Sequence, residues 1–120
     1  TSGTPWLPVN ENYRTLNAAA EEKDADSVLH FYRHLAKLRE TIPALLDGVY
    51  EELLEENEQI YAFSRTLGKT CIKTAVNFST KDAALPAGFL RGTRLAGSYA
   101  DAPTTSLRPL EAVIYEEEIQ

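Results

Sequence analysis

The sequence predicts a mainly β domain preceded by one amphipathic α-helix and an irregular N-terminal segment. Three observations lead to this prediction. Residues 26–39 are the one stretch with a sustained helical period, two prolines interrupt the first ten residues, and short β-like runs with turn residues between them follow Pro43. A chain of 120 residues is enough for one domain and leaves little room for a second core.

The segment around Trp6 is predicted to be a loop. Pro5 and Pro8 each remove a backbone donor and push the preceding residue towards extended geometry. Such a loop cannot bury a Trp by itself, so we expect another surface to cover Trp6. The polar residues that follow are expected to fix the loop by hydrogen bonds rather than to bind a ligand; they are Asn10, Asn12, Tyr13 and Asn17.

Residues 26–39 are predicted to form an α-helix with one apolar side. The residues that share this side recur at steps of three and four, and they are Val28, Phe31, Tyr32, Leu35 and Leu38. Asp24 or Asp26 can cap the N-terminus of the helix, and Pro43 prevents its continuation. One apolar stripe requires one partner surface.

Short β-like runs follow the helix. Residues 60–66 alternate in the manner of a half-buried strand. Residues 49–57 before them are ambiguous, because their Glu-rich sequence also has strong helix propensity. A turn at 67–69 leads to a run at 70–78, in which Lys73 and Thr74 favour an edge strand or a solvated face.

Composition excludes several classes of partner. The chain has 18 acidic and 12 basic residues, a net charge of −6 and no Lys/Arg cluster, so nucleic acid is not an expected partner. The apolar runs are too short to span a membrane. Cys71 is the one cysteine, so no internal disulfide can form, which favours a reducing, cytoplasmic compartment. No cofactor is predicted. Because the chain begins with Thr1 and contains no Met, we expect a fragment or a processed product.

One long segment carries a family resemblance. Residues 4–40, TPWLPVNENYRTLNAAAEEKDADSVLHFYRHLAKLRE, resemble the stretch after the eighth barrel strand of bacterial α-glucosidases in the α-amylase superfamily. The PWLPVN run, the Asn-Tyr pair one residue later and the final L-x-x-L-R of the helix agree with that pattern in order and spacing. The resemblance implies that residues 1–41 are the last loop and helix of a (β/α)₈ barrel. It implies that residues 42–120 are the antiparallel β-sandwich called domain C.

The same resemblance extends over nearly the whole chain. It favours a strand for residues 49–57, which then form a hairpin with 60–66. It identifies a turn at 85–89 and a further strand at 92–99. After a loop, it identifies residues 107–116, which contain the pattern L-x-P-x-E-A-x-x-Y, as the final strand.

The function follows from the resemblance rather than from composition. In the family the nucleophilic Asp, the acid/base Glu and the stabilising Asp lie on barrel strands four, five and seven, before Thr1, so no residue here inherits a catalytic role. The whole protein is expected to hydrolyse α-1,6 or related α-glucosidic bonds of oligosaccharides, like an oligo-1,6-glucosidase or dextran glucosidase. A sucrose isomerase or a trehalose-6-phosphate hydrolase is the alternative parent.

The implied partners follow in the same way. The chain itself is expected to be inert, its partner is the missing barrel of the same polypeptide, and the oligosaccharide binds only through that barrel. Without the barrel, the outer helix surface and Trp6 favour self-association. A second hypothesis, from another class, is an autonomous β module that binds carbohydrate or a protein.

Several residues have a chemical alternative. Trp6 could stack on a sugar, although an anchor for the loop is favoured. His30 and His34 have the spacing of a two-His metal site but no third ligand, so a non-metal pair is favoured. The Glu residues at 51, 52, 55, 56 and 58 are interpreted as a solvated acidic face rather than a catalytic pair.

Two further residues are interpreted as structural. Asn77 starts an N-glycosylation pattern, but the end of a strand is favoured, with Asn77 turning the chain. Cys71 is expected to be a packed or half-exposed residue rather than a nucleophile.

Overall fold

The structure is a computed structural model that describes residues 2–119. The chain divides into two compact units, Thr1–Lys37 and Leu38–Gln120. Among the described residues, no helix is both long enough and apolar enough to cross a membrane.

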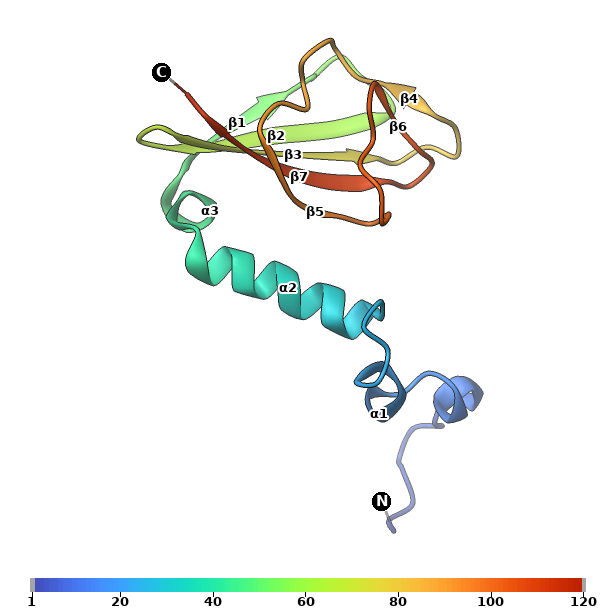
Figure 1. The fold of residues 1–120 in the computed structure, drawn as a ribbon. Coiled ribbons are helices and arrows are strands. Elements are labelled where there is room, and N and C mark those ends of the chain that lie inside the picture. Colours follow the sequence, from blue (N-terminus) through green and yellow to red (C-terminus); the bar gives the residue numbers. More distant parts are fainter. Residues whose placement is uncertain (1, 120) are drawn as a thin grey trace. The chain divides into compact units, whose positions relative to one another are not determined.

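The first unit begins with an irregular segment and two short helices (Figure 1). The 3₁₀ helix η1 covers Glu11–Arg14 and the helix α1 covers Ala18–Glu21. A side-chain cap explains the start of each helix. Asn10 Oδ1 accepts a hydrogen bond from the backbone amide of residue 12 at 3.1 Å, and Asn17 Oδ1 accepts one from the backbone amide of residue 20 at 2.9 Å. The sequence pattern did not predict these helices, since one turn is too short to show a period.

The predicted amphipathic helix is α2, Val28–Thr41. The proposed Asp caps were wrong, because Ser27 immediately precedes the helix and its Oγ accepts from the His30 amide at 3.3 Å. Glu21 Oε2 accepts from the Leu29 amide at 3.0 Å, so a carboxylate from the preceding turn satisfies a second helix donor. Asp24 instead caps its own turn by accepting from the amide of residue 26.

The apolar stripe of α2 is covered only in part, since Phe31, Leu35 and Leu38 are half-buried. No residue of the helix is buried, and Val28 and Tyr32 are largely exposed. Pro43 ends α2 as predicted, but it also occupies the first turn of a further helix, α3, Pro43–Asp47, which the sequence analysis did not foresee. Proline suits that position because the first turn needs no backbone donor.

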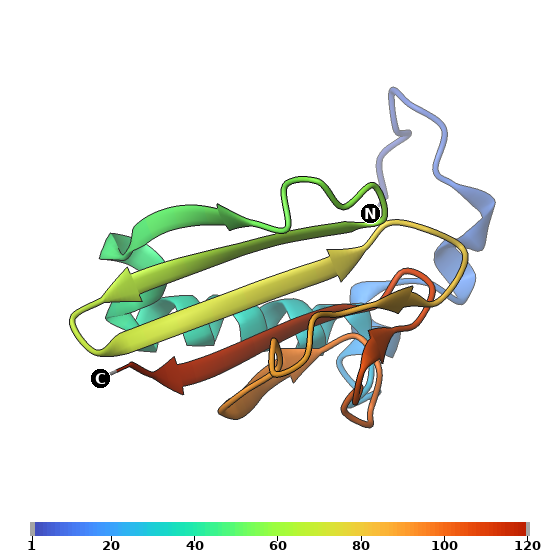
Figure 2. The same cartoon turned by 90° about the horizontal axis from the view of Figure 1, so that it is seen from above.

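The second unit is built on an antiparallel sheet of five strands in the order β1-β2-β3-β7-β5, with a separate two-stranded sheet β4-β6 (Figure 2). This architecture confirms the predicted mainly antiparallel β class with a helix before it. The strands are β1 Val49–Leu53, β2 Ile60–Leu67, β3 Thr70–Asn77, β4 Ala83–Ala84, β5 Thr93–Gly97, β6 Ser106–Leu107 and β7 Ala112–Glu118.

The predicted hairpin is confirmed by the pairing of β1 with β2. The alternation predicted for β2 is present, and the structure shows which of its two sets is buried: Ile60, Ala62 and Ser64. The next turn also forms as predicted, and Gly68 at φ +59° supplies the left-handed backbone that it needs.

Of the two alternatives for residues 70–78, an edge strand or a solvated face, the edge strand was wrong. Strand β3 pairs with β2 on one side and β7 on the other, so it is central in the sheet. Lys73 is accommodated there because its Nζ lies 2.5 Å from Glu117 Oε2 on the neighbouring strand and 5.9 Å from the centre of the Phe89 ring. A central strand therefore tolerates Lys73 through a cross-strand charge pair.

The prediction of one final strand at 107–116 was also wrong. Leu107 belongs to β6, and β7 begins only at Ala112. Between them Leu110 takes φ +56°, and the amide of Glu111 donates to the Arg108 carbonyl at 3.1 Å. This turn reverses the chain, so the two halves of the segment lie in different sheets.

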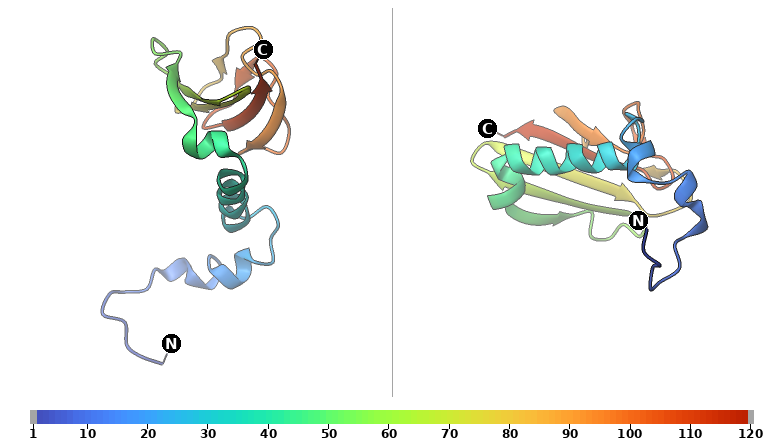
Figure 3. Two further views of the ribbon diagram at one scale, coloured as in Figure 1. Left: turned by 90° about the vertical axis from the view of Figure 1, so that its left-hand side faces the viewer. Right: turned by 90° about the horizontal axis from the view of Figure 1, so that it is seen from below.

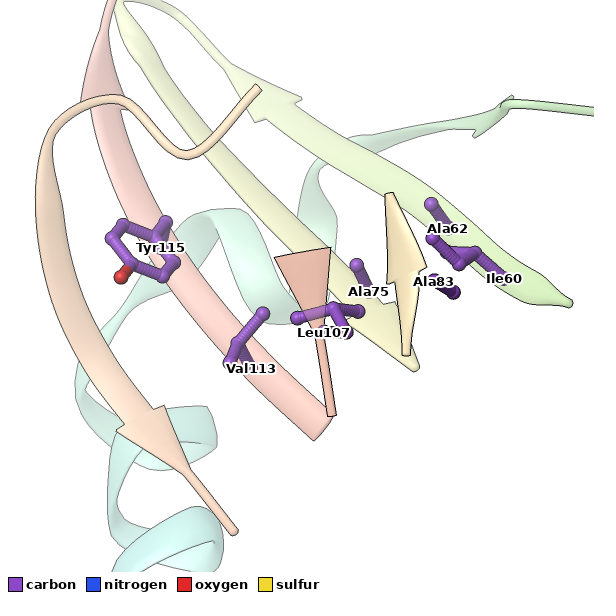
Figure 4. Close-up of a cluster of buried hydrophobic side chains, with 7 residues drawn as sticks. All are labelled: Ile60, Ala62, Ala75, Ala83, Leu107, Val113 and Tyr115. Atoms are coloured by element: carbon purple, nitrogen blue, oxygen red, sulfur yellow. The ribbon is translucent and has the colours of Figure 1, made fainter. Parts of the chain in front are cut away.

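The core lies on one face of the five-stranded sheet, here called the covered face (Figure 4). Strands β4 and β6 lie over it (Figures 1 and 4). The buried cluster consists of Ile60, Ala62, Ala75, Ala83, Leu107, Val113 and Tyr115. The opposite, open face carries Tyr61, Phe63, Val76 and Ile114, and α3 contacts β2 and β3 at one end of the sheet (Figure 3).

Candidate functional site

The most tightly connected polar cluster is a clasp formed by Tyr99, Asp101, Arg108 and Glu111. Arg108 donates to Glu111 from its backbone amide at 2.8 Å, from Nε at 3.0 Å and from Nη2 at 2.7 Å. Nη1 of the same guanidinium donates to Asp101 Oδ1 at 2.8 Å. The guanidinium carbon lies 3.9 Å from the centre of the Tyr99 ring, an arrangement that adds a cation–π contact.

The clasp holds Glu111 as a carboxylate in the interior. Glu111 is 0% exposed. Burial raises the pKa of Glu111, but hydrogen bonds from the Arg108 side chain and backbone outweigh burial, so its pKa lies below the usual range. The hydrogen bond from Arg108 likewise lowers the pKa of Asp101. Because both Glu111 oxygens accept from Arg108, the clasp is suited to locking the turn before β7 rather than to proton transfer.

Asn77, the last residue of β3, also has a structural role, because it holds backbone groups of the neighbouring loops. It is fully buried, and its Nδ2 lies within hydrogen-bonding distance of the carbonyls of residues 81, 107 and 108, at 2.7, 3.1 and 2.9 Å. Its Oδ1 accepts from the Ser79 amide at 2.9 Å. The interpretation of Asn77 as a residue that turns the chain is confirmed, and its buried amide leaves no access for a glycan.

The other residues for which the sequence offered a chemical role are the histidines of α2, the Glu residues of 51–58 and Cys71. His30 Nε2 lies 3.2 Å from the Glu22 carbonyl. Within residues 2–119, no group of three or more His, Cys, Asp or Glu side chains is placed to hold a metal ion. The five Glu residues at 51, 52, 55, 56 and 58 are all exposed, as expected of a solvated acidic face, and Cys71 is packed in the interior.

Trp6 projects from the N-terminal loop and is 92% exposed. The residues beside it do fix the loop as expected, since Asn17 Nδ2 donates to the Tyr13 carbonyl at 3.0 Å and Asn10 caps η1. A role for Trp6 in sugar contact or as an anchor stays a prediction.

A cluster of three aromatic rings on the open face was not predicted from the sequence. Tyr50 and Tyr61 lie on either side of Phe63, with ring centres 5.6 and 5.8 Å from that of Phe63, and their hydroxyl oxygens are 3.0 Å apart. The hydrogen bond to Tyr61 and desolvation raise the pKa of Tyr50 to about 12. The alternation of β2 put Tyr61 and Phe63 on one face, but only the hairpin register adds Tyr50.

Comparison with known proteins connects these features. The family model described as "Alpha amylase, catalytic domain" matches residues 1–48, and so ends immediately before β1. The oligo-1,6-glucosidase of Parageobacillus thermoglucosidasius is 36% identical over 97% of this chain and 22% of its own length. The chain belongs to the α-amylase superfamily. The resemblance inferred from the PWLPVN segment and the helix is thereby confirmed.

Solved structures of this superfamily have the same fold. The isomaltulose synthase of Klebsiella sp. LX3 matches with a TM-score of 0.86 and 36% identity, over 97% of this chain and 22% of the other. The trehalose-6-phosphate hydrolase of Bacillus licheniformis, a mutant bound to a ligand, matches with a TM-score of 0.85 and 28% identity, over 97% and 23%. The chain spans about 22% of the length of these relatives and matches a C-terminal domain of such enzymes.

Proposed function

We propose that this chain is the end of the catalytic barrel together with the C-terminal structural domain of an α-glucosidase. The whole enzyme would hydrolyse α-1,6 or related α-glucosidic bonds of oligosaccharides. The observation that carries the proposal is the similarity to an oligo-1,6-glucosidase along 97% of the chain, combined with a catalytic-domain match that stops at residue 48. In this proposal residues 1–41 belong to the barrel and residues 42–120 form the β-sandwich domain.

The mechanism proposed for the whole enzyme is a double displacement through a glucosyl-enzyme intermediate. Such a reaction needs two carboxyl groups about 5–5.5 Å apart, one as nucleophile and one as acid/base. Glu111 is engaged by Arg108, and the Glu residues of 51–58 are exposed on and beside β1. Both observations support the proposal that this chain contributes no catalytic carboxylate and acts as a buttress.

The experiment is a comparison of the complete gene product with the 120-residue chain. Both are assayed with isomaltose, sucrose and trehalose 6-phosphate. We expect the complete protein to release glucose from isomaltose and the chain alone to release none. Rearrangement of sucrose to an isomer, or hydrolysis of trehalose 6-phosphate only, would assign the parent to one of the alternatives, towards which the structural similarities above also point.

Partners and location are part of the same proposal. The partner would be the barrel of the same polypeptide, the oligosaccharide would bind through it, and the bacterial cytoplasm is the proposed compartment, in keeping with the free, buried thiol of Cys71. The exposed Trp6, Val28 and Tyr32 support self-association of the isolated chain. Sedimentation velocity over a range of concentrations tests this, and a monomer at all concentrations would contradict it.

A second candidate function is an autonomous carbohydrate-binding module. The observation in its favour is the partly exposed aromatic cluster of Tyr50, Phe63 and Tyr61, since aromatic rings with adjacent hydroxyls suit stacking on sugars. Titration of the chain with isomaltose and isomaltotriose, followed by the fluorescence of Trp6 and of the tyrosines, tests it. A saturable change below about 1 mM would favour this candidate.

A further inference from the structure

The turn of residues 22–27 joins helices α1 and α2, and it is here called the corner. It has no apolar core, because Ser27 is the only buried residue among those described in the unit Thr1–Lys37. Ser27 Oγ donates to the Glu21 carbonyl at 2.8 Å, and Glu21 Oε2 accepts from the Leu29 amide at 3.0 Å. Polar contacts between the two helices therefore set the direction in which α1 leaves α2.

Glu22 adds a second pair of contacts across the corner. Its carboxylate accepts two hydrogen bonds from Arg33, Nη1–Oε2 at 2.8 Å and Nη2–Oε1 at 2.5 Å, and its carbonyl oxygen lies 3.2 Å from His30 Nε2. The hydrogen bond from Arg33 lowers the pKa of Glu22, so the carboxylate stays charged near neutral pH. The side chains of Glu22 and Arg33 are 47% and 52% exposed, and an exposed ion pair contributes little to stability. A bidentate pair nevertheless fixes an orientation, so its expected role here is geometric.

A series of side-chain hydrogen bonds connects the corner to the segment around Trp6. Asn17 caps α1 and also donates from Nδ2 to the Tyr13 carbonyl at 3.0 Å. Asn10 caps η1, which lies immediately before these residues in the chain. Two prolines then restrict the backbone on either side of Trp6. A change of direction at the corner is therefore carried to residues 5–17.

The proposed place of this segment in the barrel links the corner to the substrate. Residues 1–48 match the catalytic-domain family model, and in the proposed function residues 1–41 are the last loop and helix of the barrel. A loop that follows a barrel strand lies at the C-terminal end of the barrel, where (β/α)₈ enzymes bind their substrates. Residues 5–17 would therefore belong to that end, whereas α2 would belong to the outer ring of helices.

We propose that the corner positions residues 5–17 at the substrate-binding end of the barrel in the complete enzyme. The inference rests on the proposed function, and it adds three positioning residues, Glu21, Glu22 and Arg33. None of the three needs to touch the substrate, because each acts through the backbone of the segment that it holds. In the proposed function this chain contributes no catalytic carboxylate, so loosening the corner weakens substrate binding and leaves the chemical step in place.

The first test measures kcat and KM of the complete protein with variants of the ion pair. Arg33→Ala and Glu22→Ala should each raise KM about fivefold and change kcat by less than about twofold. The control Lys23→Ala removes an exposed charge of the same turn and should leave both constants unchanged. Loss of folded protein lowers the apparent kcat without raising KM. A fall in kcat alone would therefore mean a purely structural role and would overturn the inference.

Conservative variants should rescue the effect. Glu21→Ala removes the acceptor of the Leu29 amide and should raise KM in the same way, whereas Glu21→Gln retains an acceptor oxygen and should keep KM within about twofold of the unaltered protein. Exchange of the ion pair, Glu22→Arg with Arg33→Glu, should recover most of the loss seen with either single Ala variant. An unchanged KM in both Glu21→Ala and Arg33→Ala would contradict the positioning role.

Hydrogen exchange of the complete protein tests the step between the corner and the substrate. In Arg33→Ala the backbone amides of residues 10–20 should exchange at least about threefold faster than in the unaltered protein, whereas those of β2 and β3 should not change. Exchange in Lys23→Ala should match that of the unaltered protein throughout. A raised KM without faster exchange at 10–20 would mean that Arg33 affects the substrate by another route, and the corner would not be the positioning element.

Failure of the inference is distinguishable from failure of the proposed function. KM is measured with whichever of isomaltose, sucrose and trehalose 6-phosphate the unaltered complete protein converts. If one of them is converted and the variants keep its KM, a catalytic parent enzyme stands and the positioning role is wrong. If none of the three is converted, the proposed function fails, and the positioning role fails with it.

Discussion

In the unit Thr1–Lys37 the only buried residue among those described is Ser27, whereas the unit Leu38–Gln120 encloses a core in which Ala62 and Leu107 are 0% exposed. The first unit nevertheless contains Trp6, Leu16 and Tyr32, which are larger than most residues of that core. Its short helices are held by local caps and by the Arg33–Glu22 ion pair, with Nη2–Oε1 at 2.5 Å. The N-terminal unit thus relies on local polar contacts, whereas the β unit makes its own apolar core.

The largest expected effect comes from the core of the β unit. Leu107→Ala removes a buried side chain of β6 and should lower the free energy of unfolding by about 3 kcal/mol through lost burial and a new cavity. The measurement is urea unfolding of the 120-residue chain followed by tyrosine fluorescence or circular dichroism. Leu110→Ala is the matched control, because the same side chain three residues later is exposed and should cost less than about 0.5 kcal/mol. Equal effects would mean that β6 does not seal the core.

The next effect concerns the clasp. Glu111→Gln removes the buried charge that Arg108 binds and should cost about 2 kcal/mol at neutral pH. The folded state lowers the pKa of Glu111. The contribution of Glu111 to the free energy of unfolding is therefore present above its unfolded pKa and is lost as pH falls through its folded pKa. The variant should therefore lose stability less steeply in acid than the parent, measured by urea unfolding from neutral to acidic pH. Parallel pH profiles would contradict the assignment.

A smaller effect is expected at alkaline pH. Because the folded state raises the pKa of Tyr50 to about 12, its contribution to stability is present below its unfolded pKa and is lost as pH rises through the folded value. Tyr61→Phe removes the hydroxyl 3.0 Å away and should bring the Tyr50 titration back towards its ordinary range. Ultraviolet titration of tyrosinate measures this change, with Tyr99→Phe as the control. An unchanged titration in Tyr61→Phe would show that the hydroxyl pair does not set this pKa.

The smallest effect is predicted for the N-terminal unit. Trp6→Ala should change the unfolding free energy of the 120-residue chain by less than about 0.5 kcal/mol, because the indole is 92% exposed. Urea unfolding monitored by circular dichroism is the measurement, and Leu107→Ala in parallel shows its sensitivity. A loss above about 1 kcal/mol would mean that Trp6 packs on this chain and that the contrast between the units is wrong.

The elements that sequence predicted well are those with strong local signals. The stripe from Val28 to Leu38 predicted α2, the alternation of residues 60–66 predicted that β2 is a half-buried strand, and Gly68 marked its turn. In the site, Asn77 was recognised because an Asn at the end of a strand satisfies nearby backbone groups.

The elements that sequence missed depend on distant neighbours. Lys73 suggested an edge strand, yet a central position is allowed because Glu117, 44 residues later, lies beside it. The clasp was not foreseen either, although Arg108 and Glu111 are three residues apart, since a strand at 107–116 would place them on opposite faces. Only the turn at Leu110 brings the two side chains together.

By itself the sequence determined the helix, the hairpin, the alternation of β2 and the superfamily, because periodicity, turn residues and motifs are local properties of the chain. Only the tertiary structure decided the strand order, the burial of Glu111 and the grouping of Tyr50 with Phe63 and Tyr61. The physical reason is that a period of two fixes which residues share a face but not which strands become neighbours, and burial is set by neighbours.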